Sequence, residues 1–163
     1  NNTGKQTDYQ KMRYALASTL LGNGYFSFDY GTNDHSQIWW YDEYNVNLGT
    51  PISGPLSVSQ KSNYDEGSVW KREYSNGIAL VNPSSKSQTV NLETDYEKII
   101  GTQDKNVNNG LVTDQVVLNS KDGLVMLKTI QTIENTFFKN GSFLRFFKTD
   151  GARARNGIFA FET

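Results

Sequence analysis

The sequence predicts a mainly β protein in which one N-terminal helix and strand precede an antiparallel β-sandwich and a C-terminal hairpin. Three observations support this class. A single stretch near the N-terminus has apolar residues at helical spacing. From residue 64 onward, short apolar runs alternate with turn residues at near-regular intervals, as in all-β domains. Aromatic residues at 13% and 14 glycines fit a β-rich chain with many turns.

The amino-acid composition argues against several classes of partner and of site chemistry. A formal net charge of -1 over 163 residues, with both signs mixed along the chain, argues against nucleic acid or an anionic membrane as the main partner. Cysteine is absent, which excludes disulfides, thiol catalysis and cysteine-ligated zinc. No apolar run approaches the roughly 18 residues of a membrane span. We expect an extracellular or cell-surface protein, and the first residue, Asn1, suggests a piece of a longer chain.

Residues 7–21 are expected to form the one long helix. Apolar side chains recur there at three- and four-residue spacing and make one apolar face: Tyr9, Met12, Leu16 and Leu20. Thr7 or Asp8 can accept hydrogen bonds from the first turn. Residues 22–24, Gly-Asn-Gly, tolerate the left-handed dihedral angles common at helix ends.

Residues 25–31 follow with the period-two pattern of a strand. A helix that leads into a strand through a short glycine turn is one repeat unit of an α/β protein. Such a strand normally lies parallel to others in a sheet buried on both faces. Since the chain offers no obvious parallel neighbours, the unit indicates a barrel or sheet that is incomplete here.

A domain boundary is expected within residues 50–65, where coil rich in glycine and proline gives way to strands. The resulting domains are residues 1–55, 64–129 and 136–163. In the second, strands at 69–74 and 78–81 flank Ser75-Asn76-Gly77, a strong hairpin signal. Four more strands are expected, at 88–92, 96–100, 112–118 and 124–129, and the last two are expected to form a second hairpin through Asp122-Gly123. Six short strands predict a β-sandwich.

The third segment, residues 136–163, is expected to begin a further β module. Two phenylalanine-rich runs, 142–147 and 157–161, flank a turn at 149–151 and form a hairpin. A lone hairpin is at best marginally stable in water, so the module is expected to continue beyond it.

Several strings together resemble a known family. Residues 12–21 (MRYALASTLL), 24–30 (GYFSFDY) and 39–44 (WWYDEY) resemble the end of the barrel in glycoside-hydrolase-like TIM-barrel proteins. Residues 70–77 (WKREYSNG) and 79–83 (ALVNP) resemble the β-sandwich that follows such barrels. The resemblance covers roughly residues 9–128.

This resemblance implies that residues 9–31 are the last helix and eighth strand of a (β/α)8 barrel, and that the chain is a C-terminal fragment. In such barrels the ligand lies at the C-terminal ends of the strands, so Asp29, Tyr30 and the next loop would face a sugar cleft. The catalytic carboxylates of many related hydrolases are on the fourth and seventh strands, which implies that this chain holds none. Carbohydrate and the remaining barrel are the implied partners, with no cofactor.

At the C-terminus, residues 143–151 (FLRFFKTDG) and 155–161 (RNGIFAF) resemble the opening of repeats in bacterial surface proteins with FG-GAP-type, integrin-like propellers. The likeness implies that propeller segments belong to the same longer chain. The acidic metal-binding loops of such repeats do not appear here, so no metal site is expected.

The stretch from Gln37 to Tyr44 carries two of the three tryptophans and two adjacent acids. It is either buried core or a platform on which a sugar ring stacks. Neighbours in an extended segment point to opposite faces, so at most one of Trp39 and Trp40 stacks on a sugar. For the same reason Asp42 and Glu43 cannot converge on one bond as a glycosidase pair. We expect one acid to be solvated and the other to hold a backbone or arginine partner.

The candidate substrate-binding residues lie in two short stretches: Asp29, Tyr30, Trp39, Trp40, Asp42 and Glu43. For Asp29 a structural hydrogen bond competes with a role in binding. His35, the only histidine, lies in a polar loop and cannot build a usual zinc site alone.

Two further interpretations stay open beside the carbohydrate-active fragment. One is a non-enzymatic β-rich binding or structural module in which the aromatic stretch is core. The other is a self-contained α+β domain.

Overall fold

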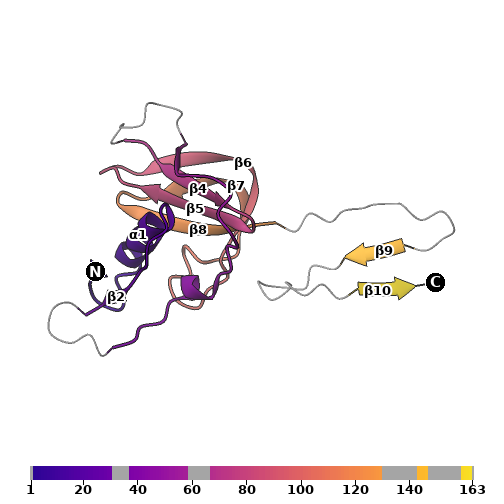
Figure 1. Cartoon of the computed structure of the whole chain (residues 1–163), viewed down its shortest axis with the longest axis horizontal. Coiled ribbons are helices and arrows are strands. Elements are labelled where there is room, and N and C mark those ends of the chain that lie inside the picture. The colour runs from indigo at the N-terminus through magenta and orange to yellow at the C-terminus, as the bar shows by residue number, and fades with distance from the viewer. Residues whose placement is uncertain (1, 31–36, 59–66, 130–142, 147–158, 163) are drawn as a thin grey trace. The chain divides into compact units, whose positions relative to one another are not determined.

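The computed structural model describes residues 2–30, 37–58, 67–129, 143–146 and 159–162. The chain forms two compact units, Asn1–Lys128 and Thr129–Thr163. Within the described residues the fold is mainly β, as predicted, with one N-terminal helix beside a six-stranded antiparallel sheet (Figure 1). Residues 59–66, at the end of the expected domain boundary, lie outside the described residues, as does His35.

The large sheet has the strand order β3-β4-β5-β8-β6-β7, and every neighbouring pair is antiparallel. Its strands are β3 (Leu56–Ser57), β4 (Trp70–Tyr74), β5 (Gly77–Asn82), β6 (Gln88–Lys98), β7 (Val112–Leu118) and β8 (Asp122–Lys128). The hairpin through Ser75 and Asn76 is confirmed as the β4–β5 connection. The short strand β3 was not predicted.

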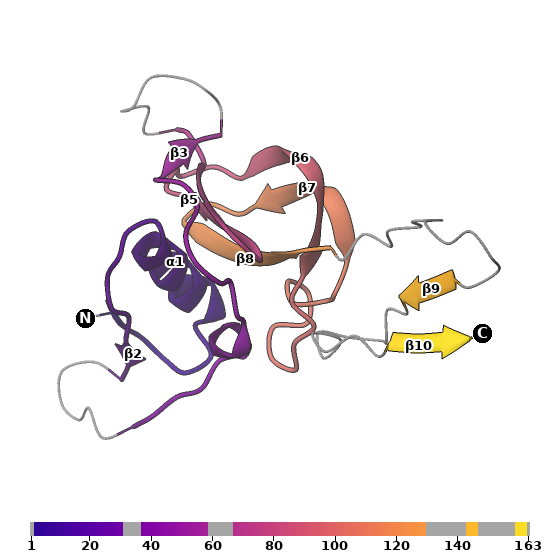
Figure 2. The same ribbon diagram turned by 45° about the vertical axis from the view of Figure 1, so that its right-hand side comes forward.

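The strands lie in one curled sheet, a half-barrel, rather than in the two stacked sheets of the expected sandwich (Figure 2). Strand β6 is the reason. It contains the strand expected at 88–92 and the first three residues of the strand expected at 96–100, and its register with β7 shifts between Asn91 and Tyr96. Beyond the shift, β6 pairs with β7 and also with β8. An irregularity of this kind bends a strand, so that one sheet can wrap around its own core.

The sheet buries apolar side chains on both faces, with alternate residues of a strand on opposite sides. Ile78 and Leu80 of β5 belong to one core cluster, whereas Ala79, between them, belongs to another. The first cluster contains Val69, Ile78, Leu80, Val90, Tyr96, Val116, Leu118, Leu124 and Met126. The second faces the helix, because Leu20 of that helix packs against it.

The helix α1 (Tyr9–Leu20) lies against β8 and β5 (Figure 1). Gly123 permits the close approach, since a Cβ there would lie 2.4 Å from the carbonyl oxygen of Arg13 and 2.6 Å from the Cβ of Ala17. The hairpin expected through Asp122 and Gly123 is wrong, because both residues are paired in β8 with β5, and β7 pairs with β6 rather than with β8. The turn lies just before them, where Lys121 has a φ of 50°. Gly123 is therefore needed for helix packing rather than for a turn.

Neither end of α1 is closed as the sequence predicted. Asp8 makes no capping hydrogen bond to the first turn, and its carboxylate instead accepts one from the backbone N–H of Lys5 at 2.8 Å. At the other end, neither Gly22 nor Gly24 has a left-handed φ.

The C-terminal end of α1 is closed by β4 instead. The Arg72 guanidinium donates to the carbonyls of Leu20 and Gly22, and the Tyr74 hydroxyl donates to Leu20 as well. A cation at the negative end of a helix is electrostatically favourable. A distant strand therefore supplies the cap that the local sequence lacks.

Before and after α1 lie the two-residue strands β1 (Asn2–Thr3) and β2 (Phe28–Asp29), which pair in parallel. Strand β2 is shorter than the run 25–31 predicted, because only Phe28 and Asp29 have a strand partner among the described residues. The β1-α1-β2 order with parallel strands is a βαβ unit.

In the second unit, β9 (Phe143–Phe146) and β10 (Phe159–Glu162) form an antiparallel pair, which confirms the expected hairpin. Throughout the described segments, no helix is both long and apolar enough to cross a membrane.

Gly123→Ala tests the helix-sheet contact. Because backbone on one side and a buried methyl on the other leave no room for a Cβ, we expect a loss of about 2 kcal/mol or more in unfolding free energy. Gly54→Ala is the matched control, since nothing lies within 4 Å of its Cβ position. Its effect should stay within about 0.5 kcal/mol. Urea unfolding followed by circular dichroism gives both values, and equal effects would contradict the packing assigned to Gly123.

Candidate functional site

The aromatic stretch after β2 packs around Tyr41. Tyr41 is fully buried, and its hydroxyl donates a hydrogen bond to the carbonyl of Gln6 at 3.0 Å. Burial raises the pKa of Tyr41 well above its ordinary value, so the phenol stays protonated. Three rings meet it edge-on at centroid distances of 5.4 to 6.3 Å: Tyr9, Phe28 and Tyr44. This geometry is favourable between aromatic rings and identifies the centre of the stretch as core.

The two adjacent tryptophans have different surroundings. Trp39 is partly buried and lies against the rings of Phe28 and Tyr30, at centroid distances of 6.1 and 6.4 Å. Trp40 is 60% exposed and meets Tyr44 edge-on at 5.6 Å. Trp39 therefore contributes to packing, and Trp40 offers an indole surface to solvent.

Although exposed, Trp40 is held at three points. Its Nε1 donates a hydrogen bond to Asn45 Oδ1 at 3.1 Å, which fixes the indole in its plane. The edge contact with Tyr44 limits its rotation. Its backbone carbonyl accepts a hydrogen bond from Gln103 Nε2 at 3.0 Å. A flat, exposed and fixed aromatic ring is suited to stacking against a ring-shaped ligand.

Asp42 begins the short 3-10 helix η1 (Asp42–Asn45), where the sequence was interpreted as extended. Acidic residues suit the positive first turn of such a helix. The Asp42 carboxylate accepts hydrogen bonds from the backbone N–H groups of Thr102 and Gln103, at 2.9 and 2.8 Å. Gly101 makes room for it, because a Cβ there would lie 2.5 Å from Asp42 Oδ2. Asp42 thus has the backbone partner expected for one of the two acids, and it anchors the loop of residues 101–109.

Glu43 is buried rather than solvated. Its Oε1 accepts a hydrogen bond from Asn108 Nδ2 at 2.9 Å, again from the 101–109 loop. Burial raises the pKa of the Glu43 carboxyl, while the hydrogen bond from Asn108 and the charge of Arg13 act in the opposite direction. Both acids therefore bind the same loop, through different partners.

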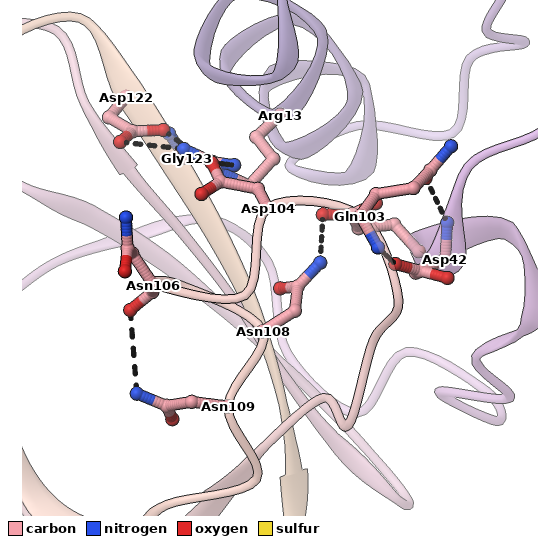
Figure 3. Close-up of polar contacts among 10 residues, drawn as sticks. Arg13, Asp42, Gln103, Asp104, Asn106, Asn108, Asn109, Asp122 and Gly123 are labelled. Carbon is pink, nitrogen blue, oxygen red and sulfur yellow. Dashed lines mark hydrogen bonds and ion pairs between the residues drawn. The ribbon is translucent and has the colours of Figure 1, made fainter. Parts of the chain in front are cut away.

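Arg13 completes this polar cluster from the helix (Figure 3). Its side chain is 3% exposed, and its Nε and Nη2 each lie 3.2 Å from a carboxylate oxygen of Asp122, while Nη1 lies 2.5 Å from Asp104 Oδ2. Burial by itself would lower the pKa of Arg13, but the two carboxylates outweigh it and raise the pKa. The guanidinium remains charged and joins α1 to β8 and to the 101–109 loop.

The other two candidates lie at the β2 end of the aromatic stretch. Asp29 is buried at 9% exposure, and its backbone carbonyl accepts a hydrogen bond from the N–H of Gly4 at 3.0 Å. Tyr30 is 56% exposed and packs edge-on against Trp39. The loop that follows, which was expected to face a cleft, lies outside the described residues.

The six candidates thus fall into two groups. Trp40, Asp42 and Glu43 contact the 101–109 loop, whereas Asp29, Tyr30 and Trp39 lie at β2. Four residues that interact with the first group were not predicted from the sequence: Arg13, Asn45, Gln103 and Asn108. Arg13 carries a detectable signal, because it is a lone cation beside Met12 and Ala17 on the buried side of α1. Gln103 and Asn108 of the 101–109 loop carry no such signal in the sequence, because their partners Asp42 and Glu43 are about 60 positions away.

Among the described residues, no group of three or more histidine, cysteine, aspartate or glutamate side chains is placed to hold a metal ion. The cluster itself presents an exposed indole at Trp40 beside two acids that are engaged in hydrogen bonds.

Residues 1–78, just under half of the chain, match the family model described as hypothetical glycosyl hydrolase family 15. The match includes α1, the aromatic stretch and the β4–β5 turn, and it ends before the 101–109 loop. Comparison with curated proteins and with solved structures found no match.

Glu43→Gln tests the burial of this carboxyl through pH. Because the folded-state pKa of Glu43 lies above its ordinary value of 4.5, the group contributes stability below that value and the contribution is lost as pH rises through the folded pKa. The variant cannot ionise and can still accept the Asn108 hydrogen bond. Its unfolding free energy should therefore rise relative to the unaltered chain as the pH increases from 4.5 through the folded-state pKa of Glu43.

Urea unfolding midpoints across this range provide the measurement, with the exposed Asp114→Asn as control. A difference between Glu43→Gln and the unaltered chain that is independent of pH, or that changes with the opposite sign, would show that Glu43 is not held in a desolvating environment.

Proposed function

We propose that this chain is the carbohydrate-contacting C-terminal part of a glycoside-hydrolase-like protein, with Trp40 as a stacking platform for a neutral sugar and no catalytic carboxylate of its own. The observation that carries the proposal is an indole that is 60% exposed and yet held by Asn45, Tyr44 and Gln103. Exposing a large aromatic ring to water is unfavourable, and a role in ligand binding would explain why Trp40 is exposed.

The family match supports the carbohydrate class of the ligand. The matched segment, residues 1–78, contains Trp40 together with Asn45 and Tyr44, and the family is described as a hypothetical glycosyl hydrolase family. Sugars present apolar C–H faces edged by hydroxyl groups, which an indole beside amide side chains complements. The neighbouring acids Asp42 and Glu43 make an anionic sugar the less favourable ligand.

The βαβ unit supports the proposal of a larger parallel barrel. Two-residue parallel strands are too short to form a stable sheet alone, and parallel strands are normally buried within larger sheets. In a (β/α)8 barrel, β1 and β2 would be neighbouring barrel strands joined by α1. Asp29 and Tyr30, at the C-terminal end of β2, would then lie at the ligand-binding end of that barrel.

The proposal leaves catalysis to residues outside this chain. Asp42 and Glu43 are engaged by the backbone of residues 102 and 103 and by Asn108, so neither is positioned as a free general acid or base. An extracellular or cell-surface location is part of the same proposal and rests on composition together with the carbohydrate ligand.

The rival function is a non-enzymatic β-rich binding or structural module. The complete burial of Tyr41 favours it, because the centre of the aromatic stretch is core. The two functions make different predictions for Trp40: a carbohydrate-binding chain uses its exposed ring, whereas a purely structural module has no need to expose it.

Trp40→Ala is expected to weaken oligosaccharide binding roughly ten-fold or more, since a tryptophan that dominates an interface contributes about 2 kcal/mol or more. The ligands would be neutral hexasaccharides of glucose, xylose and N-acetylglucosamine, measured by isothermal titration calorimetry. Tyr25→Ala is the matched control, because Tyr25 is a fully exposed aromatic residue for which no ring contact is seen in the described structure. Binding that survives Trp40→Ala unchanged would rule out the platform and favour the structural module.

A further inference from the structure

Gln103 makes three hydrogen bonds with the segment that carries the platform. Its own N–H donates to Asp42 Oδ2 at 2.8 Å, its Oε1 accepts from the N–H of Asp42 at 3.0 Å, and its Nε2 donates to the carbonyl of Trp40 at 3.0 Å. The side-chain amide therefore binds the backbone on both sides of Tyr41. Figure 3 shows Gln103 and Asp42 facing each other across the gap between the loop and η1.

The loop that presents Gln103 is itself fixed. Asp104 is paired with Arg13 of α1, and Asn108 donates to Glu43. Within the loop, the carbonyl of Asp104 accepts hydrogen bonds from the N–H groups of Val107 and Asn108. A β-bridge between Ile100 and Asn109 closes its base. Gln103 thus stands on a rigid support that is anchored to the helix and to η1.

We propose that Gln103 is a positioning residue for the Trp40 platform: it fixes the backbone of residues 40–42 so that the indole is presented to a sugar without further ordering. The inference rests on the function proposed above. It also extends the site beyond the family match, because Gln103 lies outside residues 1–78.

The physical reason is pre-organisation. A side chain that is already immobile loses less conformational entropy when a ligand binds, and the affinity is higher by the amount saved. Asn45 and Tyr44 contact the ring of Trp40 rather than its backbone. The hydrogen bond from Gln103 restrains that backbone directly.

Gln103→Met is the test, because methionine has a similar length and lacks both side-chain hydrogen bonds. We expect binding of the best neutral hexasaccharide to weaken roughly two- to ten-fold. The heteronuclear NOE of the Trp40 indole N–H should fall as well, with its resonance identified from Trp40→Phe. Gln103→Asn, whose amide is too short to reach both backbone groups, is a second variant that keeps the site polar.

Thr102→Val is the matched control. It removes a hydrogen bond of 3.3 Å to Asp42 Oδ1 from the same loop and leaves the Gln103 contacts intact. This variant should keep both the affinity and the Trp40 order of the unaltered chain. Equal losses in Thr102→Val and Gln103→Met would overturn the positioning role, because they would reflect general loosening of the loop.

The two measurements separate this inference from the proposed function. Unchanged Trp40 order in Gln103→Met overturns the inference, whatever the sugar does. Reduced Trp40 order with unchanged affinity also overturns it, because positioning would then have no effect on binding. If the unaltered chain binds no hexasaccharide, the proposed function fails, and the NOE alone decides whether Gln103 holds Trp40.

Discussion

The buried guanidinium of Arg13 is the constraint on which the rest of the first unit depends. It comes from α1, forms a forked pair with Asp122 of β8, and binds Asp104 of the 101–109 loop. Its charge also acts on Glu43. Removing one partner of a buried ion pair typically costs roughly 3–5 kcal/mol, because the remaining charge is left without compensation. Three chain segments therefore have to meet at one point, beside Gly123, where the helix and the sheet are in close contact.

The ion pairs of Arg13 also determine the geometry of the candidate site. Arg13 fixes Asp104, Asp104 fixes the loop, and the loop holds the backbone of Trp40 and Asp42 through Gln103. The aromatic stretch divides accordingly into a buried half around Tyr41 and one exposed ring, Trp40. The proposed platform is thus a joint product of the family-matched segment, residues 1–78, and of a loop beyond it.

Local signals predicted much of the fold. The apolar spacing of α1, the β4–β5 turn through Ser75 and Asn76 and the run of β7 each depend on neighbours in sequence, and the structure confirms all three. Long-range features escaped prediction. Two expected strands form the single bent strand β6, and the two expected sheets form one curled sheet. Gly123 was expected in a turn because its contact with α1 cannot be deduced from neighbouring residues.

The same distinction applies to the site. The sequence indicates that Trp39 and Trp40 point in different directions, but the choice of the exposed one depends on contacts with Phe28, Tyr30 and Tyr44. The partners of Asp42 and Glu43 lie about 60 residues away, so their structural engagement could not be deduced from spacing. The binding role of Trp40 and the identity of its ligand are both proposals.

Nitrogen-15 chemical-shift mapping of the full chain with neutral hexasaccharides at millimolar concentration tests the central claim most directly. We expect the largest chemical-shift changes at the Trp40 indole N–H and at the side-chain amides of Asn45 and Gln103, with smaller changes at Thr102. Changes centred elsewhere on the chain, or none with any of the sugars, would contradict it.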